Sequence, residues 1–451
     1  MKIVIAGAGK VGRTIATALT AEKHDITVID SDPETIEEIS GELDVICVEG
    51  NAADPETLRE ARTGEAELLI ATTEKDEVNM VCGMASHHLG VEHVIARIRD
   101  PQYLHQTDFL REAMGLTSIV NPEYECAKEV SRILRFPGAA RVDSFSKGSV
   151  EIAEYRVPAE SVLNGLALKE LAGRFRAKVL IGLVEREDTA LIPNGNTVLW
   201  EGDRLSITGA SGELRRFFAA IGAYRKPVRH AMVMGGGRTA VYLYRLLHDS
   251  NISVTVLERD RELCERLCDA MPDAEIVCGD ATSSEILGEY GIESTDAFVA
   301  LTGDDGDNIV TSLYAKECQV GKVVIKVNRD HFADILIGAG LESIVSPKEI
   351  VAEQITRYVR GLSDSAGSSM EMLYRLADGK IEALEFRADE NLRCTNRPLK
   401  ELKLKKNTLL TAIIRGSKSI LPDGESRILP GDHAVVVAES GTVGTLDDIL
   451  E

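Results

Sequence analysis

A glycine-rich turn, followed at a fixed distance by an acidic residue, occurs twice in this chain. Residues 7–12 read GAGKVG and follow the apolar run 2–6, and Asp30 closes the next apolar run. Residues 235–240 read GGGRTA, and Glu258 stands at the same distance from the first glycine as Asp30 does in the first copy. A glycine turn between a strand and a helix, with an acid after the second strand, is typical of a dinucleotide-binding fold. One such motif is weak evidence, but two copies in register constrain the fold strongly.

The sequence divides into four segments that alternate in size. Residues 1–136 and 230–360 each contain short apolar runs separated by stretches of helical periodicity, which predicts a parallel sheet with helices on both faces. Residues 137–222 and 370–451 show alternating polarity and turn residues, which predicts a small α+β unit with one or two helices. The expected fold class is α/β, with two Rossmann-like doubly wound parallel-sheet domains, each followed by a small α+β domain.

The two halves also match outside the glycine turns. The sequence LKEL occurs at 168–171 and again at 399–402, and Gly-Asp occurs at 202–203 and again at 431–432. Similarity at a nearly constant separation indicates that a unit of one large and one small domain was duplicated.

The net charge of the chain argues against some partners. With 51 basic and 73 acidic residues the formal charge is −22, so we expect no nucleic acid partner and no adsorption to an anionic membrane surface. The negative charge is compatible with docking onto the Lys/Arg-rich cytoplasmic loops of a membrane protein. It is equally compatible with a charge that serves only to keep the protein soluble. No apolar run approaches the roughly 20 residues of a membrane-spanning helix. Because no signal peptide precedes the first strand, we expect a cytosolic protein.

Eight cysteines are scattered through the chain. Only Cys264 and Cys268 lie close in sequence, one helical turn apart, and no CxxC pair is present. Without a secretory context we interpret the cysteines as buried thiols and expect no metal site.

The first glycine turn and its acid have distinct expected roles. Gly7 permits the tight turn, and Gly9 lets the backbone approach a phosphate at the N-terminus of the following helix. Asp30 is placed to accept hydrogen bonds from an adenosine ribose diol, and its charge disfavours a 2′-phosphate. NAD(H), ADP or ATP are therefore expected in preference to NADP(H). The alternative is a tight turn that holds no ligand.

Polar residues after other strands are further candidates. Thr72 and Thr73 follow the fourth apolar run, at the edge where ligands bind in open α/β sheets. Arg97 ends the fifth run and is a charge-assisted donor for a phosphate. Arg99 is a weaker candidate, with a solvent-facing position as the alternative. Asn51, just beyond the third run, is placed to line the adenine or ribose edge.

The second copy departs from the first. Ala240 replaces the third glycine, which the motif tolerates. Residues 303–307 read GDDGD, and these carboxylates either repel phosphate, hold a divalent cation or simply begin a helix in solvent, of which we favour the helix start. The second copy lacks the arginine that ends the fifth apolar run of the first copy. We expect Lys326 to precede that position and Arg329 to lie beyond it. We therefore expect the second cleft to be the weaker nucleotide site.

The sequence offers no convincing catalytic centre. Tyr124 and Lys128 fit the Tyr-xxx-Lys of short-chain dehydrogenases, but Glu349 and Glu353 stand there in the second copy, so we interpret the match as chance. A dehydrogenase also needs a proton donor in its substrate domain, and residues 137–222 contain no histidine. We expect a binding protein that is not an enzyme. The alternatives are an NAD-dependent oxidoreductase and a regulator of a different membrane transporter.

Over essentially its whole length the chain resembles the TrkA family, the cytosolic nucleotide-binding subunits of Trk potassium uptake systems, built from two tandem RCK (regulator of potassium conductance) units. The resemblance rests on residues 1–12, Asp30, 76–81 (DEVNMV), 96–103 (ARIRDPQY) and 136–139 (FPGA), and on the small modules after each copy. It implies NAD(H) or ATP/ADP in the clefts and a homo-oligomeric ring, a tetramer of tandem chains. It also implies attachment, at the inner face of the cell membrane, to a TrkH-type potassium translocating subunit.

The resemblance further implies a sensor without chemistry, in which nucleotide binding sets the shape of the ring and thereby the gate of its partner. It extends the candidate contacts beyond those argued above from the residues. In the first cleft the candidates are Gly7, Ala8, Gly9, Lys10, Val11, Asp30, Asn51, Thr72, Thr73 and Arg97, and in the second they are Gly235, Gly236, Gly237, Arg238, Thr239 and Glu258.

Overall fold

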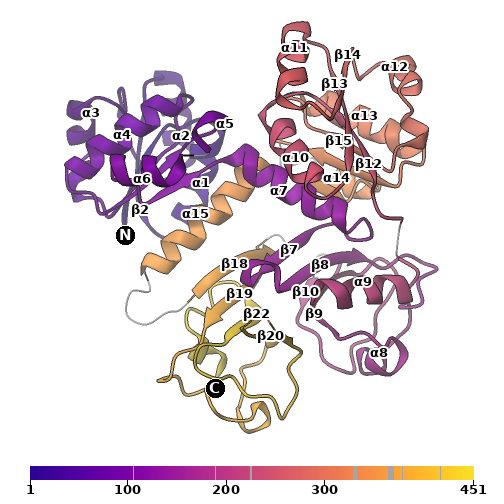
Figure 1. The fold of residues 1–451 in the computed structure, drawn as a ribbon. Helices are drawn as coiled ribbons and strands as arrows, with labels where there is room; N and C mark the ends of the chain where they lie inside the picture. Colours follow the sequence, from indigo (N-terminus) through magenta and orange to yellow (C-terminus); the bar gives the residue numbers. More distant parts are fainter. Residues whose placement is uncertain are drawn as a thin grey trace.

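Two six-stranded parallel sheets with the same strand order form the large domains (Figure 1). The structure is a computed structural model, and it describes all residues except 105, 188, 224–225, 329–332, 364–369, 378 and 417. The first sheet, ordered β3-β2-β1-β4-β5-β6, contains β1 (Lys2–Ala6), β2 (Asp25–Asp30), β3 (Ile46–Glu49), β4 (Leu68–Ala71), β5 (His93–Arg97) and β6 (Ser118–Val120). Its connections are α1 (Lys10–Ala21), α2 (Pro33–Glu42), α3 (Pro55–Glu60), α4 (Asp76–His88), α5 (Pro101–Leu104) and α6 (Thr107–Met114), and α7 (Pro122–Arg135) follows β6.

The second large domain repeats this topology, which confirms the predicted pair of Rossmann-like domains. Its sheet, ordered β14-β13-β12-β15-β16-β17, contains β12 (His230–Met234), β13 (Ser253–Glu258), β14 (Glu275–Cys278), β15 (Ala297–Ala300), β16 (Lys322–Lys326) and β17 (Ser343–Val345). Its helices are α10 (Arg238–His248), α11 (Arg261–Ala270), α12 (Ser284–Glu289), α13 (Asp305–Glu317), α14 (Ala333–Gly338) and α15 (Pro347–Ser363).

The small domains are two five-stranded antiparallel sheets, ordered β10-β9-β11-β8-β7 and β18-β19-β22-β20-β21. The first contains β7 (Val142–Phe145), β8 (Val150–Arg156), β9 (Val179–Arg186), β10 (Thr189–Leu191) and β11 (Arg204–Gly209), with α8 (Leu168–Arg174) and α9 (Ser211–Ala220). The second contains β18 (Met370–Leu376), β19 (Ile381–Arg387), β20 (Thr408–Arg415), β21 (Lys418–Ile420) and β22 (His433–Glu439).

The two small sheets differ in their helices but share one core. We expected one or two helices in each, yet in its described part the second has only the short 3-10 helices η5 (Leu399–Glu401) and η6 (Leu446–Ile449). One apolar cluster joins both sheets, and in it the rings of Phe145 and Tyr374 meet edge to face at 4.9 Å. The two small domains therefore form a single packed unit.

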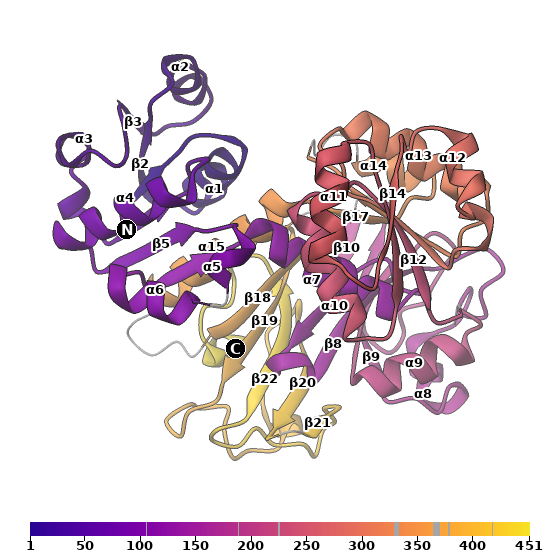
Figure 2. The same ribbon diagram turned by 45° about the horizontal axis from the view of Figure 1, so that its top comes forward.

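The last helix of each large domain packs on the other large domain (Figures 1 and 2). The buried residues Cys126 and Val130 of α7 lie in one cluster with Tyr242 and Leu243 of α10. Likewise, Ile355 of α15 is buried in the cluster of the first sheet. The alternation of strands and helices along the sequence predicts that each helix covers the sheet of its own domain. In the structure α7 and α15 are exchanged, so that each covers the sheet of the other large domain, and the two helices contact each other.

The exchange predicts that a substitution in α15 destabilises the first large domain. Ile355 has no exposed surface and packs with Ile15 of α1. Ile355→Ala should lower the free energy of unfolding by about 2–5 kcal/mol, the usual cost of such a core truncation. Hydrogen exchange should accelerate in β1 and β4, while Ile335→Ala on the exposed face of α14 should change little. Faster exchange confined to the second sheet would contradict the exchange of helices.

A buried charged cluster lies where α7, α15 and the small sheets meet. The Nε of Arg141 lies 3.1 Å from the Asp143 carboxylate and 3.7 Å from that of Glu129, and its Nη2 lies 3.3 Å from Glu353. Burial raises the pKa of the Glu129 carboxyl to about 7 although Arg141 acts to lower it. Burial also raises the pKa of Glu353. Glu129 and Glu353, two of the carboxylates around this guanidinium, thus retain protons more readily than in water.

This cluster predicts a pH dependence of stability. Since the pKa of Glu129 is raised from 4.5 to about 7 in the folded chain, the folded state binds more protons between these values. The free energy of unfolding should therefore fall as pH rises from about 4.5 to about 7. Glu129→Gln should flatten this slope in denaturant unfolding, whereas Glu125→Gln, on the same helix, should leave it intact. An unaltered slope in Glu129→Gln would exclude the assigned role.

Candidate nucleotide-binding clefts

The first glycine turn has the backbone geometry that the motif requires. Gly7 has φ +103°, and a Cβ there would lie 2.7 Å from the Thr73 nitrogen. A Cβ on Gly12 would lie 1.8 Å from the Gly7 carbonyl oxygen. At Gly9, by contrast, a Cβ would meet no atom within 4 Å. The turn thus depends on Gly7 and Gly12, while Gly9 leaves open space before the N-terminus of α1.

The acid after the second strand binds the glycine turn in both copies. Asp30 Oδ2 accepts a hydrogen bond from the Ala8 N–H at 2.6 Å, and Glu258 Oε2 accepts one from the Gly236 N–H at 2.8 Å. Ala8 and Gly236, both named as candidates, are absent from the linings of the two clefts, and these bonds engage their N–H groups. Each carboxylate oxygen can accept a further hydrogen bond, so the acids remain available to ribose hydroxyls.

A cavity of about 970 Å³ lies at the carboxyl edge of the first sheet. Apart from Ala8, every candidate of the first copy lines it, namely Gly7, Gly9, Lys10, Val11, Asp30, Asn51, Thr72, Thr73 and Arg97. Its charged lining comprises six basic residues against four acidic ones, which favours an anionic ligand. They are Lys10, Lys75, Arg97, Arg99, Lys326 and Lys348 against Asp30, Asp32, Glu74 and Glu123.

Arg97 lies in this cleft with its hydrogen-bonding capacity only partly used. Its side chain is buried, and Nη2 donates to the Thr73 carbonyl at 2.6 Å. Among the described residues its buried Nε has no hydrogen-bond partner. Burial, and secondarily the neighbouring charge of Arg99, lowers the pKa of Arg97 to about 10. A phosphate would stabilise this desolvated cation and fits the unsatisfied donor.

Two other candidates support the turn with their hydroxyl groups. Thr72 is buried and its hydroxyl donates to the Gly7 carbonyl at 3.1 Å. The hydroxyl of Thr73 donates to Asn79 Oδ1 at 2.7 Å, and Asn79 Nδ2 donates to the Arg97 carbonyl at 2.9 Å. Asn308 forms the same bonds in the second copy. These asparagines, visible in the sequence only as a repeat, position the ligand edge of both sheets.

The second large domain supplies part of the wall of the first cleft. Thr239, Lys326, Asn328 and Lys348 line it, and sequence reasoning missed all four there. Lys326 ends β16 and its carbonyl accepts from Asn308 at 3.0 Å, as that of Arg97 accepts from Asn79. Lys326 thus occupies the position of Arg97, and the expectation that it precedes this position was wrong. Arg329 lies outside the described residues.

The second cleft encloses about 560 Å³ and is more acidic. Its predicted residues Gly235, Gly237, Arg238, Thr239 and Glu258 line it, and Thr239, Lys326 and Glu123 line both clefts. Only three basic residues face five acidic ones, so phosphates are less favoured here. They are Arg238, Arg259 and Lys326 against Glu123, Glu258, Asp280, Asp304 and Asp307.

The carboxylates of residues 303–307 begin a helix, as we favoured. Asp304 caps α13 by accepting from the Asp307 N–H at 2.9 Å. Asp305 accepts from the backbone and side-chain amides of Asn328. These bonds explain two of the acidic residues without any ligand.

The weaker candidate Arg99 lies at the first cleft, whereas the pair that fits the dehydrogenase pattern lies outside both clefts. Arg99 does not face solvent, because it lies 3.6 Å from Asp76 and 3.7 Å from Glu123 and lines the first cleft. Tyr124 and Lys128 line neither cleft. Tyr124 packs against Tyr242, and Lys128 pairs with Glu125 at 2.8 Å.

The expectation that all cysteines are buried was wrong in part. Cys82, Cys126, Cys264 and Cys394 are buried, whereas Cys268 and Cys278 are exposed. In α11 the buried residues are Cys264 and Leu267, while Cys268, one turn after Cys264, is exposed near the end of the helix.

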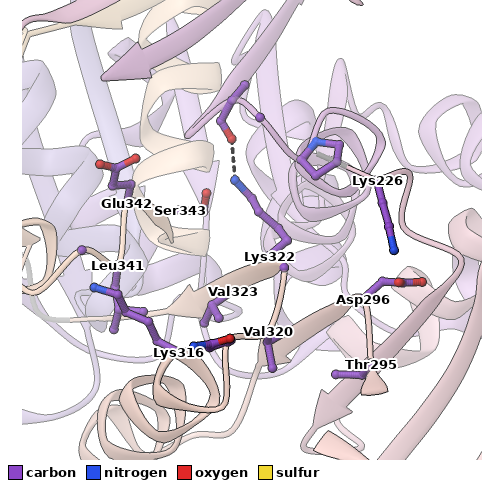
Figure 3. Close-up of a pocket in the computed structure, with 16 residues that line it drawn as sticks. Lys226, Thr295, Asp296, Lys316, Val320, Lys322, Val323, Leu341, Glu342 and Ser343 are labelled. Atoms are coloured by element: carbon purple, nitrogen blue, oxygen red, sulfur yellow. Dashed lines mark hydrogen bonds between the residues drawn. The ribbon is translucent and has the colours of Figure 1, made fainter. Parts of the chain in front are cut away.

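A further cavity of about 570 Å³ opens at the opposite edge of the second sheet, where its strands begin (Figure 3). Several of its lysines are already engaged. Lys322 donates to the Ala139 carbonyl and Lys316 to that of Ala339. Since ligands of open α/β sheets bind at the carboxyl ends of the strands, the two clefts remain the candidate sites.

The fold and the paired clefts define a class: tandem Rossmann-type domains, each followed by a small antiparallel-sheet domain. Residues 3–122 and 231–347 match the TrkA-N domain, and residues 152–222 and 383–451 match the TrkA-C domain. The chain belongs to the TrkA family. No helix within the described ranges is long and apolar enough to cross a membrane.

Relatives and solved structures resemble the chain over nearly its full length. The chain is 31% identical over 451 residues to a Trk system potassium uptake protein TrkA homolog of Archaeoglobus fulgidus, covering 100% of both chains. It is 30% identical to Trk system potassium uptake protein TrkA of Vibrio alginolyticus, covering 97% of this chain and 95% of that one. The GsuK channel bound to NAD matches with a TM-score of 0.64 at 19% identity, covering 99% of this chain and 78% of that chain. A likeness at such low identity concerns the fold alone.

The geometry of the first cleft predicts its ligand preference. NAD(H), ADP or ATP should bind more tightly than NADP(H) in calorimetric titration, because Asp30 disfavours a 2′-phosphate. Asp30→Ala should weaken binding by about 1–3 kcal/mol, the cost of unpaired ribose hydroxyls and a loosened turn. Glu258→Ala, the equivalent substitution in the second cleft, is the matched control and should leave the nucleotide affinity of the first cleft unchanged. Equal affinity for NADP(H) would remove the role given to Asp30.

Proposed function

We propose that this protein is a nucleotide-binding regulatory subunit of a potassium uptake system. The proposal rests above all on the first cleft, where a glycine turn, an acid and an unsatisfied buried arginine face one cavity. Relatives that carry the name of Trk potassium uptake proteins align with the chain from end to end. The protein therefore binds an adenine nucleotide and controls potassium movement through a membrane partner.

The ligand of the first cleft is NAD(H), with ATP or ADP as the other candidates. GsuK has been solved bound to NAD and also bound to ADP, so this fold accepts both kinds of ligand. In the present chain the contacts are the ten first-copy candidates, with Ala8 contributing only through its bond to Asp30. The second cleft, which has the same turn but a more acidic lining, binds an anionic nucleotide more weakly.

Binding is transmitted through the exchanged helices. Pro122 and Glu123 begin α7, Pro347 and Lys348 begin α15, and all four residues line the first cleft. A nucleotide that contacts these helix ends favours one relative placement of the two large domains. Its differential affinity for two placements supplies the coupling, on the order of 1–3 kcal/mol per site. A small sheet follows each helix along the chain and moves with it.

The chain assembles as a homo-oligomeric ring, a tetramer of tandem chains, on the cytoplasmic side of a TrkH-type partner. Two helices present apolar side chains to solvent in the single chain, a feature typical of an assembly face. On α4 these are Val81 and Met84, and on α13 they are Val310, Leu313 and Tyr314. The charge of −22 suits the basic cytoplasmic loops of a membrane protein.

The protein binds its nucleotide without transforming it. Tyr124 and Lys128, the pair that fits a dehydrogenase pattern, are engaged with Tyr242 and Glu125 at the contact of α7 and α10. Arg97, Asp30 and the glycine turn recognise a ligand but offer no proton donor at a reacting carbon.

Filling the phosphate space at Gly9 should uncouple nucleotide binding from transport. A Cβ at Gly9 meets no atom within 4 Å, and its φ of −64° suits any residue, so Gly9→Val should fold and assemble normally. Nucleotide binding should fall sharply, and potassium or rubidium uptake in cells lacking the native subunit should no longer respond to nucleotide. Gly41→Val on α2, where a Cβ is equally unobstructed, is the control. Light scattering verifies assembly in each variant. An unchanged uptake response despite lost binding would reject the sensor role of the first cleft.

A further inference from the structure

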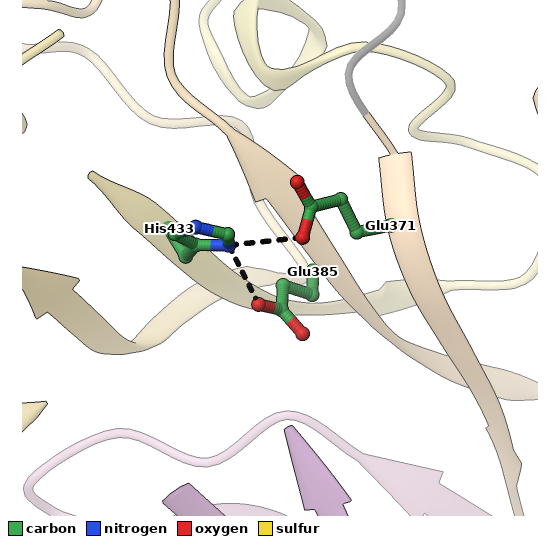
Figure 4. Close-up of side chains that lie close together, drawn as sticks. All are labelled: Glu371, Glu385 and His433. Carbon is green, nitrogen blue, oxygen red and sulfur yellow. Dashed lines mark hydrogen bonds and ion pairs between the residues drawn. The ribbon is translucent and has the colours of Figure 1, made fainter. Parts of the chain in front are cut away.

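Three potential metal ligands converge in the second small domain (Figure 4). Glu371 of β18, Glu385 of β19 and His433 of β22 place one ligand atom each within 4.8 Å of the others. The His433 Nδ1 lies 2.9 Å from Glu385 Oε1 and 3.1 Å from Glu371 Oε2. The strand register shifts between Met370 and Met372, so Glu371 lies at an irregularity of β18. Such bulges re-aim a side chain and are frequent beside functional sites.

Glu385 is the buried member of this cluster. Its side chain is 1% exposed, and Ser146, from the turn between β7 and β8, donates to it through both its backbone N–H and its hydroxyl. Because Ser146 belongs to the first small domain, Glu385 also joins the two small sheets. A buried carboxylate is costly unless hydrogen bonds and a nearby cation compensate its charge.

The duplicated position in the first small domain shows how that charge is compensated there. Arg204 follows Gly202-Asp203 as His433 follows Gly431-Asp432, and both residues open the equivalent strand. Arg204 pairs with Glu154 at 3.4 Å and with Glu185 at 3.0 Å. The first copy thus sets a permanently charged guanidinium against its carboxylates. The second copy sets an imidazole there, which is a cation only when protonated.

We propose that Glu371, Glu385 and His433 bind a divalent transition metal, with Zn²⁺ as the best fit. One imidazole nitrogen and two carboxylate oxygens are ligands that Zn²⁺ takes, and a water completes a tetrahedron. With bonds of roughly 2.0–2.2 Å, tetrahedral ligand atoms lie about 3.3–3.6 Å apart. The Nδ1 to oxygen distances of 2.9 and 3.1 Å need to open by only a few tenths of an ångström.

The metal supplies the positive charge that Arg204 supplies in the first copy. It holds β18, β19 and β22 together beside Ser146, at the contact of the two small sheets. The metal site is separate from the nucleotide clefts, because the cluster lies in a small domain and shares no residue with either cleft.

Zinc titration of the full chain tests this site. Chelator-treated, tag-free protein should bind one Zn²⁺ per chain in competition with a chromophoric chelator. His433→Arg recreates the arrangement of the first copy, so it should fold, yet lose Zn²⁺ affinity by more than roughly tenfold, the loss typical even for a group that only supports a ligand. Glu385→Gln should lose it similarly. His88→Arg, at an exposed histidine of α4, should bind as wild type does.

Two further measurements make the result decisive. X-ray absorption should show only nitrogen and oxygen ligands near roughly 2.0–2.1 Å, without the sulfur near about 2.3 Å that cysteine binding would give. Zn²⁺ should raise the thermal midpoint of wild type and not of His433→Arg. Absent binding, sulfur ligands or unchanged affinity in His433→Arg would each overturn the proposal and leave His433 as a hydrogen-bonding partner of the two carboxylates. Nucleotide titration of the same samples should be unaffected, so failure here is distinguishable from failure of the nucleotide sensor.

Discussion

The exchange of α7 and α15 is the contact on which the arrangement of this molecule depends. Each helix buries its apolar side in the other large domain, so neither sheet is covered without a helix from the other half. Apolar burial of this kind is the main favourable term in folding, and here it also fixes the two large domains relative to each other. The clefts consequently share Glu123, Thr239 and Lys326, and a ligand in one is adjacent to the wall of the other.

The duplicated halves keep their framework and differ in their charges. Asn79 and Asn308 tie the same loop to the same strand with nearly the same distances. The copies differ at the end of the fifth strand, where the first has Arg97 and the second has Lys326. Lysine lacks the planar guanidinium that binds phosphate through two parallel hydrogen bonds. Burial lowers the pKa of Lys326, as it does that of Arg97. The framework therefore tolerates divergence of ligand preference without a change of fold.

Local pattern is sufficient to predict the sheets and most of the first cleft. A glycine turn after a strand specifies its own geometry, so the positions of Gly7 and Asp30 follow from the sequence alone. The exchange of helices does not follow, because periodicity shows that a helix has an apolar side but not which sheet covers it. Lys348 and Asn328 were missed in the first cleft for this reason.

Other parts of the sites were hidden by sequence distance. Arg99 was only a weaker candidate from the sequence, because its partner Asp76 lies far from it along the chain, at the start of α4. Glu371, Glu385 and His433 lie on three strands, and no ligand spacing along the chain brings them together. Antiparallel pairing of β19 with both β18 and β22 creates that proximity, and pairing is a tertiary property.

The two small sheets are packed together and form one body. Phe145 and Tyr374 pack the two sheets on one core, and Tyr374 also donates to the Ser144 carbonyl at 2.8 Å. Packed cores have discrete arrangements and do not deform smoothly. A change in the placement of α7 and α15 must therefore move the two small sheets together, as one body. The ion pairs of Arg141 with Glu129 of α7 and Glu353 of α15 lie at that junction, so a change in the placement of the two helices acts on them directly.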